Sequence, residues 1–138
     1  MSSTGFSAMN LTFRVHDELL AIARLPADAE VPPWALGGFV TVSRTRDELS
    51  IVCAERHVPL DVVQTRGKIA LGIAGVVPMT TVGLLAELCG ALARSAVPVF
   101  VISTHDTDWL LVSADRFEAA RIALEGIGQR VEGQAPSA

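Results

Sequence analysis

The sequence predicts an α+β protein built from ferredoxin-like βαββαβ units. In the second half of the chain, strand and helix patterns follow one another in the order β-α-β-β-α-β, which is the order of the split βαβ unit. In addition, a stretch of the first half resembles a stretch of the second, which favours a pseudo-repeat. We therefore expect two halves, at residues 10–66 and 67–132, with eroded helices in the first.

The composition indicates a small folded protein and argues against a nucleic-acid partner. The chain has 138 residues, of which 50% are hydrophobic, and its mean hydropathy is +0.43. This length fits one domain or two very small ones, with enough apolar residues for a core. The net charge is −4 and the eleven Lys and Arg residues are scattered, so no basic stripe is available for nucleic acid.

The lack of a recognisable targeting signal and the setting of the two cysteines favour a cytoplasmic protein. The first ten residues carry neither a positive region nor a long apolar run, so they do not resemble a signal peptide. The apolar runs are far shorter than the ~20 residues of a membrane-spanning helix. Cys53 and Cys89 lie in an apolar strand and an apolar helix, as expected of buried thiols in a reducing compartment.

The first half is predicted to be mostly strands. Its strand patterns occur at residues 11–15, 19–25, 39–43, 48–53 and 60–63, and the third and fourth of these read as a hairpin. The segment Pro26–Pro33 contains three prolines and two acids, which excludes a regular element, and Trp34–Leu36 can form at most one helical turn. Thr65–Lys68 has the composition of a turn and is taken as the boundary between the halves.

The second half contains two amphipathic helices. Its strand patterns occur at residues 69–73, 99–104, 109–113 and, as an edge strand, 129–132. Thr80 or Thr81 is expected to cap the first helix, a contribution of about 1 kcal/mol. The buried stripe of this helix is Leu84, Leu85, Leu88 and Leu92, and that of the second is Phe117, Ala120, Leu124 and Ile127.

An internal echo supports the pseudo-repeat. Ser43–Val52 aligns without gaps on Ser103–Val112. Both stretches have a serine, a polar turn, an acid five positions on and then a strand that ends in valine. Val31-Pro32 likewise echoes Val77-Pro78, except that the helix that follows in the first half has shrunk to a turn.

Two features of the second half could meet a ligand. At the helix start near Gly83, backbone N–H groups lack intrahelical partners and favour a carboxylate or phosphate by roughly 0.3–1 kcal/mol. This start could equally be a capped helix that packs on its own sheet. In the turn Ser103–Asp108, the carboxylates of Asp106 and Asp108 could neutralise an ammonium or guanidinium, or the segment could be an ordinary hairpin turn.

Catalysis, metals and cofactors are not expected. Ser103 or Thr104 next to His105 would have to form a catalytic set from consecutive residues of one turn, which rarely converge in this way. Cys53 and Cys89 are isolated, and no second His or Cys pair stands at ligand spacing. We therefore expect a protein that is not an enzyme and has no cofactor.

Several of these segments resemble a known family. The loop Val77–Leu85 after a strand, together with Ile102–Thr104 before an acid-bearing strand, is similar to an ACT domain. The chain resembles, more narrowly, the tandem ACT modules of aspartokinase regulatory regions and of CASTOR-type amino-acid sensors. The resemblance implies ferredoxin-like units that pair side by side and bind amino acids at the pairing interface. Where many ACT loops carry an Asp and a Pro before the turn glycine, this chain has Thr80 and Val82.

The resemblance and the residues together predict an amino-acid-binding regulatory module. The expected ligand-binding residues are Val77, Pro78, Met79, Thr80, Thr81, Val82, Gly83, Ile102, Ser103, Thr104, Asp106 and Asp108. The two carboxylates favour a neutral polar or basic amino acid over an acidic one. The other partners expected are a regulated enzyme or signalling protein and a second copy in a homodimer, but no nucleic acid or membrane. The alternative is an interaction or dimerisation module without a ligand.

Overall fold

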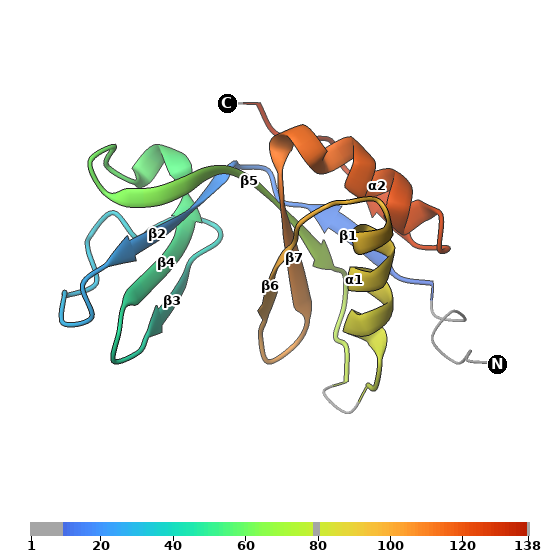
Figure 1. Cartoon of the computed structure of the whole chain (residues 1–138), viewed down its shortest axis with the longest axis horizontal. Coiled ribbons are helices and arrows are strands. Elements are labelled where there is room, and N and C mark those ends of the chain that lie inside the picture. Colours follow the sequence, from blue (N-terminus) through green and yellow to red (C-terminus); the bar gives the residue numbers. More distant parts are fainter. Residues whose placement is uncertain (1–9, 79–80, 138) are drawn as a thin grey trace. The chain divides into compact units, whose positions relative to one another are not determined.

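The chain forms two compact units, which are described separately. The computed structural model describes residues 10–78 and 81–137 (Figure 1). Residues 17–68 form one unit, called the sheet unit below. Residues 69–78 and 81–135, together with residues 10–16, form the other, called the helical unit.

The helical unit has the predicted βαββαβ order. Its elements are β5 (Val63–Ile73), α1 (Leu84–Arg94), β6 (Phe100–Ser103), β7 (Asp108–Ser113), α2 (Phe117–Glu125) and β8 (Arg130–Glu132), with the 3-10 turn η2 (Ala114–Arg116) before α2. The part of β5 that belongs to this unit is residues 69–73. The α+β fold class with ferredoxin-like units is thus confirmed.

Both helices of this unit bury one apolar face. Leu84, Leu88 and Leu92 of α1 are buried, as predicted, whereas Leu85 is only partly buried. In α2, which contacts α1, the buried residues are Phe117, Ala120 and Leu124. Burying one such leucine or phenylalanine contributes roughly 1.5–3 kcal/mol. Neither helix, nor any other in the described part of the chain, is long and apolar enough to cross a membrane.

A strand from the start of the chain completes the sheet of the helical unit. β1 (Thr12–Val15) pairs antiparallel with β5 and parallel with β8, so the strand order is β6-β7-β5-β1-β8. Phe13 is fully buried there, and the Leu11 N–H donates to Gln129 Oε1 at 2.6 Å. The predicted halves assigned residues 10–16 to the first half, but these hydrogen bonds place them in the helical unit. An alternating pattern identifies a strand without naming its partners.

The sheet unit keeps the strands of the fold without its α-helices. It contains β2 (Leu20–Leu25), β3 (Thr41–Arg44), β4 (Leu49–Ala54), the 3-10 turn η1 (Glu55–His57) and residues 63–68 of β5, in the strand order β3-β4-β2-β5. One face of β2 and β4 buries Ala21, Ala23, Leu49, Ile51 and Cys53. Trp34 and Ala35, which directly follow the proline-rich segment Pro26–Pro33, pack against this core.

The predicted strand at 60–63 and the predicted turn at 65–68 are both wrong. Val63–Ile73 is one strand, and Thr65–Lys68 lies inside it. The turn-like composition has a different cause: the register between β2 and β5 shifts between Leu20 and Ile22, and Gly67 opposite this irregularity has a positive φ of 73°. Glycine adopts that conformation at low cost, and such an irregularity bends a strand without ending it.

The two hairpins are equivalent, but one residue away from the predicted alignment. Thr45 N–H donates to Glu48 O at 2.9 Å, and Thr104 N–H donates to Thr107 O at 2.8 Å. The equivalent residues Thr45 and Thr104 are therefore 59 positions apart, whereas the predicted alignment placed Ser43 on Ser103, 60 positions apart. The start of η1 at Glu55 and of η2 at Ala114 keep the same spacing of 59.

Gly72 is predicted to be irreplaceable because the ring of Trp109 lies on it. A Cβ at position 72 would lie 2.5–2.7 Å from three ring atoms of Trp109. We expect Gly72→Ala to displace the indole and to destabilise the helical unit by about 1–3 kcal/mol. Chemical denaturation followed by Trp109 fluorescence, in a Trp34→Phe background, measures this change.

Gly90→Ala is the matched control. Gly90 lies inside α1, and its added Cβ would approach only the end of the Arg94 side chain, at 3.4 Å. Since alanine is the better helix former, this variant should gain roughly 0.5–1 kcal/mol. Equal stability of the two variants would contradict the packing described for Gly72.

Candidate ligand-binding site

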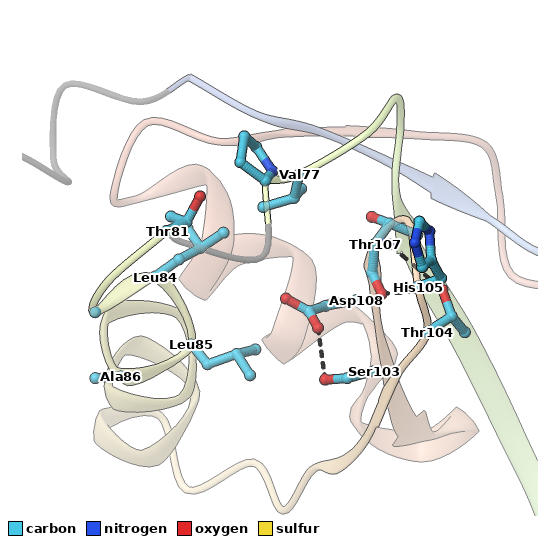
Figure 2. A pocket seen from close by; sticks show the side chains of 12 residues that line it. Val77, Thr81, Leu84, Leu85, Ala86, Ser103, Thr104, His105, Thr107 and Asp108 are labelled. Atoms are coloured by element: carbon cyan, nitrogen blue, oxygen red, sulfur yellow. Dashed lines mark hydrogen bonds between the residues drawn. The ribbon is translucent and has the colours of Figure 1, made fainter.

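A pocket in the helical unit joins the two features singled out in the sequence. Its volume is about 400 Å³, within the range of small-molecule sites. It lies between the loop after β5, the start of α1 and the turn between β6 and β7 (Figure 2). The lining residues are Val77, Pro78, Thr81, Gly83, Leu84, Leu85, Ala86, Ser103, Thr104, His105, Thr107 and Asp108.

The start of α1 presents backbone donors to this pocket. Gly83 is the N-cap residue, with a φ of 83°, and no side chain caps the helix. Glu87 N–H donates to Gly83 O at 3.1 Å. The N–H groups of Leu84, Leu85 and Ala86 precede this bond and have no acceptor within the helix.

The predicted threonine cap is therefore wrong for Thr81. The helix begins three residues later, and the Thr81 N–H donates to Pro78 O at 2.9 Å in the loop before it. The other candidate, Thr80, lies outside the described residues, as does Met79. A capping motif predicts a helix start from side chains alone, whereas here a glycine in the left-handed conformation makes the turn into the helix.

Hydrogen bonds hold the opposite side of the pocket in place. Val77 N–H donates to Asp106 O at 2.8 Å and so ties the loop after β5 to the hairpin turn. The Thr107 hydroxyl donates to Ile73 O, at the end of β5, at 3.0 Å. The Thr104 hydroxyl donates to Thr107 O at 3.1 Å within the turn. The loop and the turn therefore form one connected rim.

Asp108 is the acid that faces the pocket. Its Oδ1 accepts a 2.6 Å hydrogen bond from the Ser103 hydroxyl, and Figure 2 shows its carboxylate pointing from β7 toward the start of α1. None of the described lining residues is Lys or Arg. Burial and, second, the negative charge of Asp108 raise the pKa of the nearby Cys89 thiol. The field of this carboxylate thus reaches α1.

His105 and Asp106 lie at the tip of the turn. The His105 Nδ1 is 2.9 Å from Asp106 Oδ1, and their side chains are 90% and 66% exposed. An exposed pair of this kind contributes little to stability. We therefore assign Asp106 a part in the rim through its backbone carbonyl, which accepts from Val77.

The structure brings together most, but not all, of the predicted site residues. Val77, Pro78, Thr81, Gly83, Ser103, Thr104 and Asp108 line the pocket. Val82, Ile102 and Asp106 are not among its lining residues, and the Val82 side chain is 73% exposed. The sequence reasoning missed Leu84, Leu85, Ala86, His105 and Thr107, which directly follow or separate the residues that it named.

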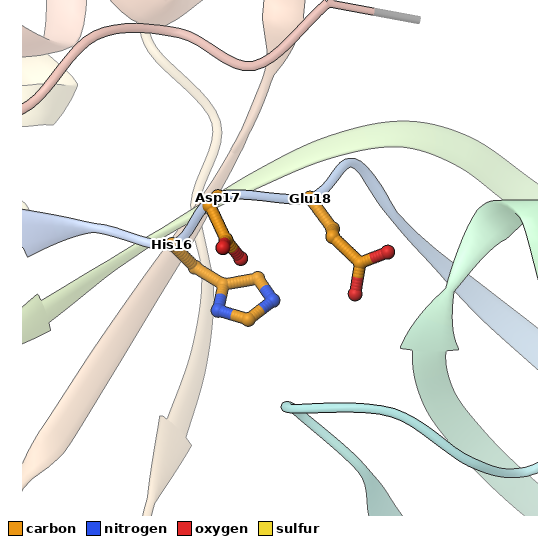
Figure 3. A group of neighbouring side chains, drawn as sticks. All are labelled: His16, Asp17 and Glu18. Atoms are coloured by element: carbon orange, nitrogen blue, oxygen red, sulfur yellow. The ribbon is translucent and has the colours of Figure 1, made fainter.

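A second group of polar side chains lies between β1 and β2. Ligand atoms of the consecutive residues His16, Asp17 and Glu18 lie within 4.8 Å of one another (Figure 3). Glu18 already forms an ion pair with Arg56, whose Nε is 2.6 Å from its Oε2. Exposed acidic groups are often this close without a metal, and we assign no metal to the group.

Comparison with known proteins identifies the class of the fold. A family model described as an N-terminal domain matches residues 18–61, and one described as an ACT domain matches residues 64–126. No match was found among curated proteins. The two matches together account for residues 18–61 and 64–126 of the chain.

Solved structures agree with this class. A protein from Agobacterium tumefaciens is 31% identical, with a TM-score of 0.85 over 95% of this chain and 100% of that one. The ligand-free regulatory subunit of aspartate kinase from Thermus thermophilus is 12% identical, with a TM-score of 0.61 over 86% of this chain and 99% of that one. The aspartate kinase of Clostridium acetobutylicum is 12% identical, with a TM-score of 0.62 over 82% of this chain and 34% of that one. The two kinase structures show a shared fold. The ACT-domain match assigns residues 64–126 of the chain to the ACT-domain family.

The link between Asp108 and Cys89 predicts a change in thiol reactivity. Because the charge of Asp108 helps to raise the pKa of Cys89, Asp108→Asn should lower this pKa toward its ordinary value. The thiolate fraction at pH 8, and with it the rate of alkylation by iodoacetamide, should then increase. The measurement uses a Cys53→Ala background. Asp106→Asn, at the exposed tip, is the control and should leave the rate unchanged; a rate that does not respond to Asp108→Asn would contradict the proximity.

Proposed function

We propose that the chain is a regulatory module that binds an amino acid in the pocket of the helical unit and catalyses no reaction itself. The observation that carries the proposal is the pocket, where backbone N–H groups without an acceptor inside α1 lie opposite the carboxylate of Asp108. Membership of the ACT-domain family supports it, since these domains generally bind amino acids.

The two sides of the pocket favour the two kinds of charged group that a free amino acid carries, a carboxylate and an ammonium. The N–H groups of Leu84, Leu85 and Ala86, together with the helix dipole, favour a carboxylate. Asp108 favours an ammonium or another cation. The hydroxyl oxygens of Ser103 and Thr104, whose protons are donated to Asp108 and to Thr107 O, can accept from a polar group. Leu84, Leu85, Val77 and Pro78 supply the apolar part of the lining.

The charge of the pocket supports a neutral polar or basic amino acid over aspartate or glutamate. An acidic side chain near Asp108 would meet a like charge in a site where the described lining contains no Lys or Arg. A cationic side chain would instead be paired. Of the two acids of the turn, Asp108 contributes most, because it begins β7 and faces the pocket, whereas Asp106 lies at the exposed tip.

The cellular setting and the assembly form part of the same proposal. The free thiols of Cys53 and Cys89 suit a reducing, cytoplasmic location. A change in ligand occupancy would act on a regulated enzyme or signalling protein, with the chain as a homodimer. The competing function is an interaction or dimerisation module whose pocket takes no ligand.

A thermal-shift screen against the common amino acids separates the two functions. If the module binds an amino acid, a concentration 100 times the Kd should stabilise the fold by about 2.7 kcal/mol. A screen in which no amino acid raises the Tm would favour the interaction module.

Gly83→Val tests where the carboxylate lies. A valine side chain at the N-cap should block close approach to the backbone donors and abolish the ligand-induced shift. Because Gly83 has a positive φ, the variant should also lose about 1–2 kcal/mol of stability. Gly67→Val is the matched control: Gly67 also has a positive φ, nothing lies within 4 Å of its added Cβ, and it belongs to the sheet unit. Binding that survives Gly83→Val would show that the helix start is not used.

Asp108→Asn tests selectivity. A hydrogen bond to a partly buried charged group contributes about 1.5–3 kcal/mol, so this variant should bind a basic amino acid roughly ten- to a hundredfold more weakly. Calorimetric titration of the wild type, Asp108→Asn and the control Asp106→Asn measures the change. Unchanged affinity, or a wild type that prefers aspartate, would contradict the assignment.

A further inference from the structure

In the sheet unit, an arginine stands at the position that corresponds to Ser103 in the pocket of the helical unit. In the hairpin equivalence, Arg44 corresponds to Ser103, and Leu49 corresponds to Asp108, each 59 positions earlier. Arg44 is paired with Leu49 across the first hairpin, as Ser103 is paired with Asp108 across the second. Paired residues of neighbouring strands share a face of the sheet, so both pairs stand at the same place in their units.

In the sheet unit, the side chain of Arg44 extends from this position to the neighbouring loop. Its Nη1 donates to Ala27 O, in the loop after β2. A second arginine acts on the turn itself, since Arg24 Nη2 donates to Asp47 O at 2.9 Å. Arg44 thus links the hairpin to the loop after β2, and Arg24 links its turn to β2 itself.

The helical unit has the same rim without the arginine. Asp106 corresponds to Asp47, and its carbonyl is again tied down, here by the Val77 N–H at 2.8 Å. At the position of Arg44, however, stands Ser103, whose short side chain donates to Asp108 at 2.6 Å. The carboxylate of Asp108 stands at the position of Leu49, and the pocket of about 400 Å³ is lined by Ser103 and Asp108 on one side and by Val77 and Pro78, in the loop after β5, on the other.

We infer that a cationic group of the ligand, a guanidinium or an alkylammonium, takes in the helical unit the position that Arg44 takes in the sheet unit. The inference rests on the proposed function and narrows its ligand class to basic amino acids. Asp108 supplies the countercharge that a free cation needs. The sheet unit, closed by its own arginines, binds no ligand, so each chain takes one.

The first test compares L-arginine with L-citrulline, which has the same shape and no positive charge. Calorimetric titration of the full wild-type chain should give one L-arginine site per chain and an affinity for L-citrulline at least tenfold lower. Equal affinities, or two sites per chain, would overturn the inference while amino-acid binding stands. If neither these nor the other common amino acids bind, the proposed function fails instead.

The second test introduces an arginine at position 103 of the helical unit. Ser103→Arg places a guanidinium at the equivalent position, next to Asp108, so binding of L-arginine should be lost and the Tm without ligand should rise. Ser43→Arg is the control, because Ser43 is exposed on β3 and lies outside the pocket; it should leave binding unchanged. A folded Ser103→Arg chain that binds L-arginine as the wild type does would overturn the inference.

Discussion

The hydrogen bond from Val77 N–H to Asp106 O, 2.8 Å long, is the constraint on which the pocket depends. It joins the loop after β5 to the β6–β7 turn, and the Thr107 hydroxyl adds a second link to the end of β5 at 3.0 Å. With both links made, the start of α1 and the carboxylate of Asp108 face the same cavity. The donors belong to the backbone, and the Asp108 carboxylate, on a short side chain at the start of β7, is held by the Ser103 hydroxyl at 2.6 Å.

The two units share a hairpin that pairs with a third strand, in the orders β3-β4-β2 and β6-β7-β5, but they cover these strands differently. In the helical unit, apolar stripes on α1 and α2 cover the sheet, and the helix start opens a site. In the sheet unit, Trp34 and Ala35 cover the core instead, and no α-helix supplies backbone donors beside the hairpin. Proline and acidic residues after β2 account for this loss, because they exclude a helix where the other unit has one.

The sequence predicted those parts of the fold that depend on local patterns. The helical stripes and the order of strands were predictable from periodicity, and the loop and turn that line the pocket were recognisable from their composition. The pairing of the strands was not predictable in this way. Phe13 lies in an alternating pattern that indicates a strand, but the position of this strand between β5 and β8 depends on distant residues. The helix start near Gly83 was predicted, but the threonine cap at Thr81 and the turn at Thr65–Lys68 were wrong, because the positive φ angles of Gly83 and Gly67 cannot be read from local composition. The hairpin alignment was wrong by one residue because it was based on the identity of Ser43 and Ser103, whereas the hydrogen bonds of the turns, which the sequence does not show, align Thr45 with Thr104.

The most direct test of the account is the backbone amide spectrum of the labelled full chain during titration with L-arginine. The account predicts chemical-shift changes that concentrate at Leu84–Ala86 and at Ser103–Asp108, with the amides of Arg44–Leu49 in the sheet unit nearly unchanged. Saturable changes centred on the sheet unit, or no saturable change at all, would contradict the central claim that the pocket of the helical unit is the ligand site.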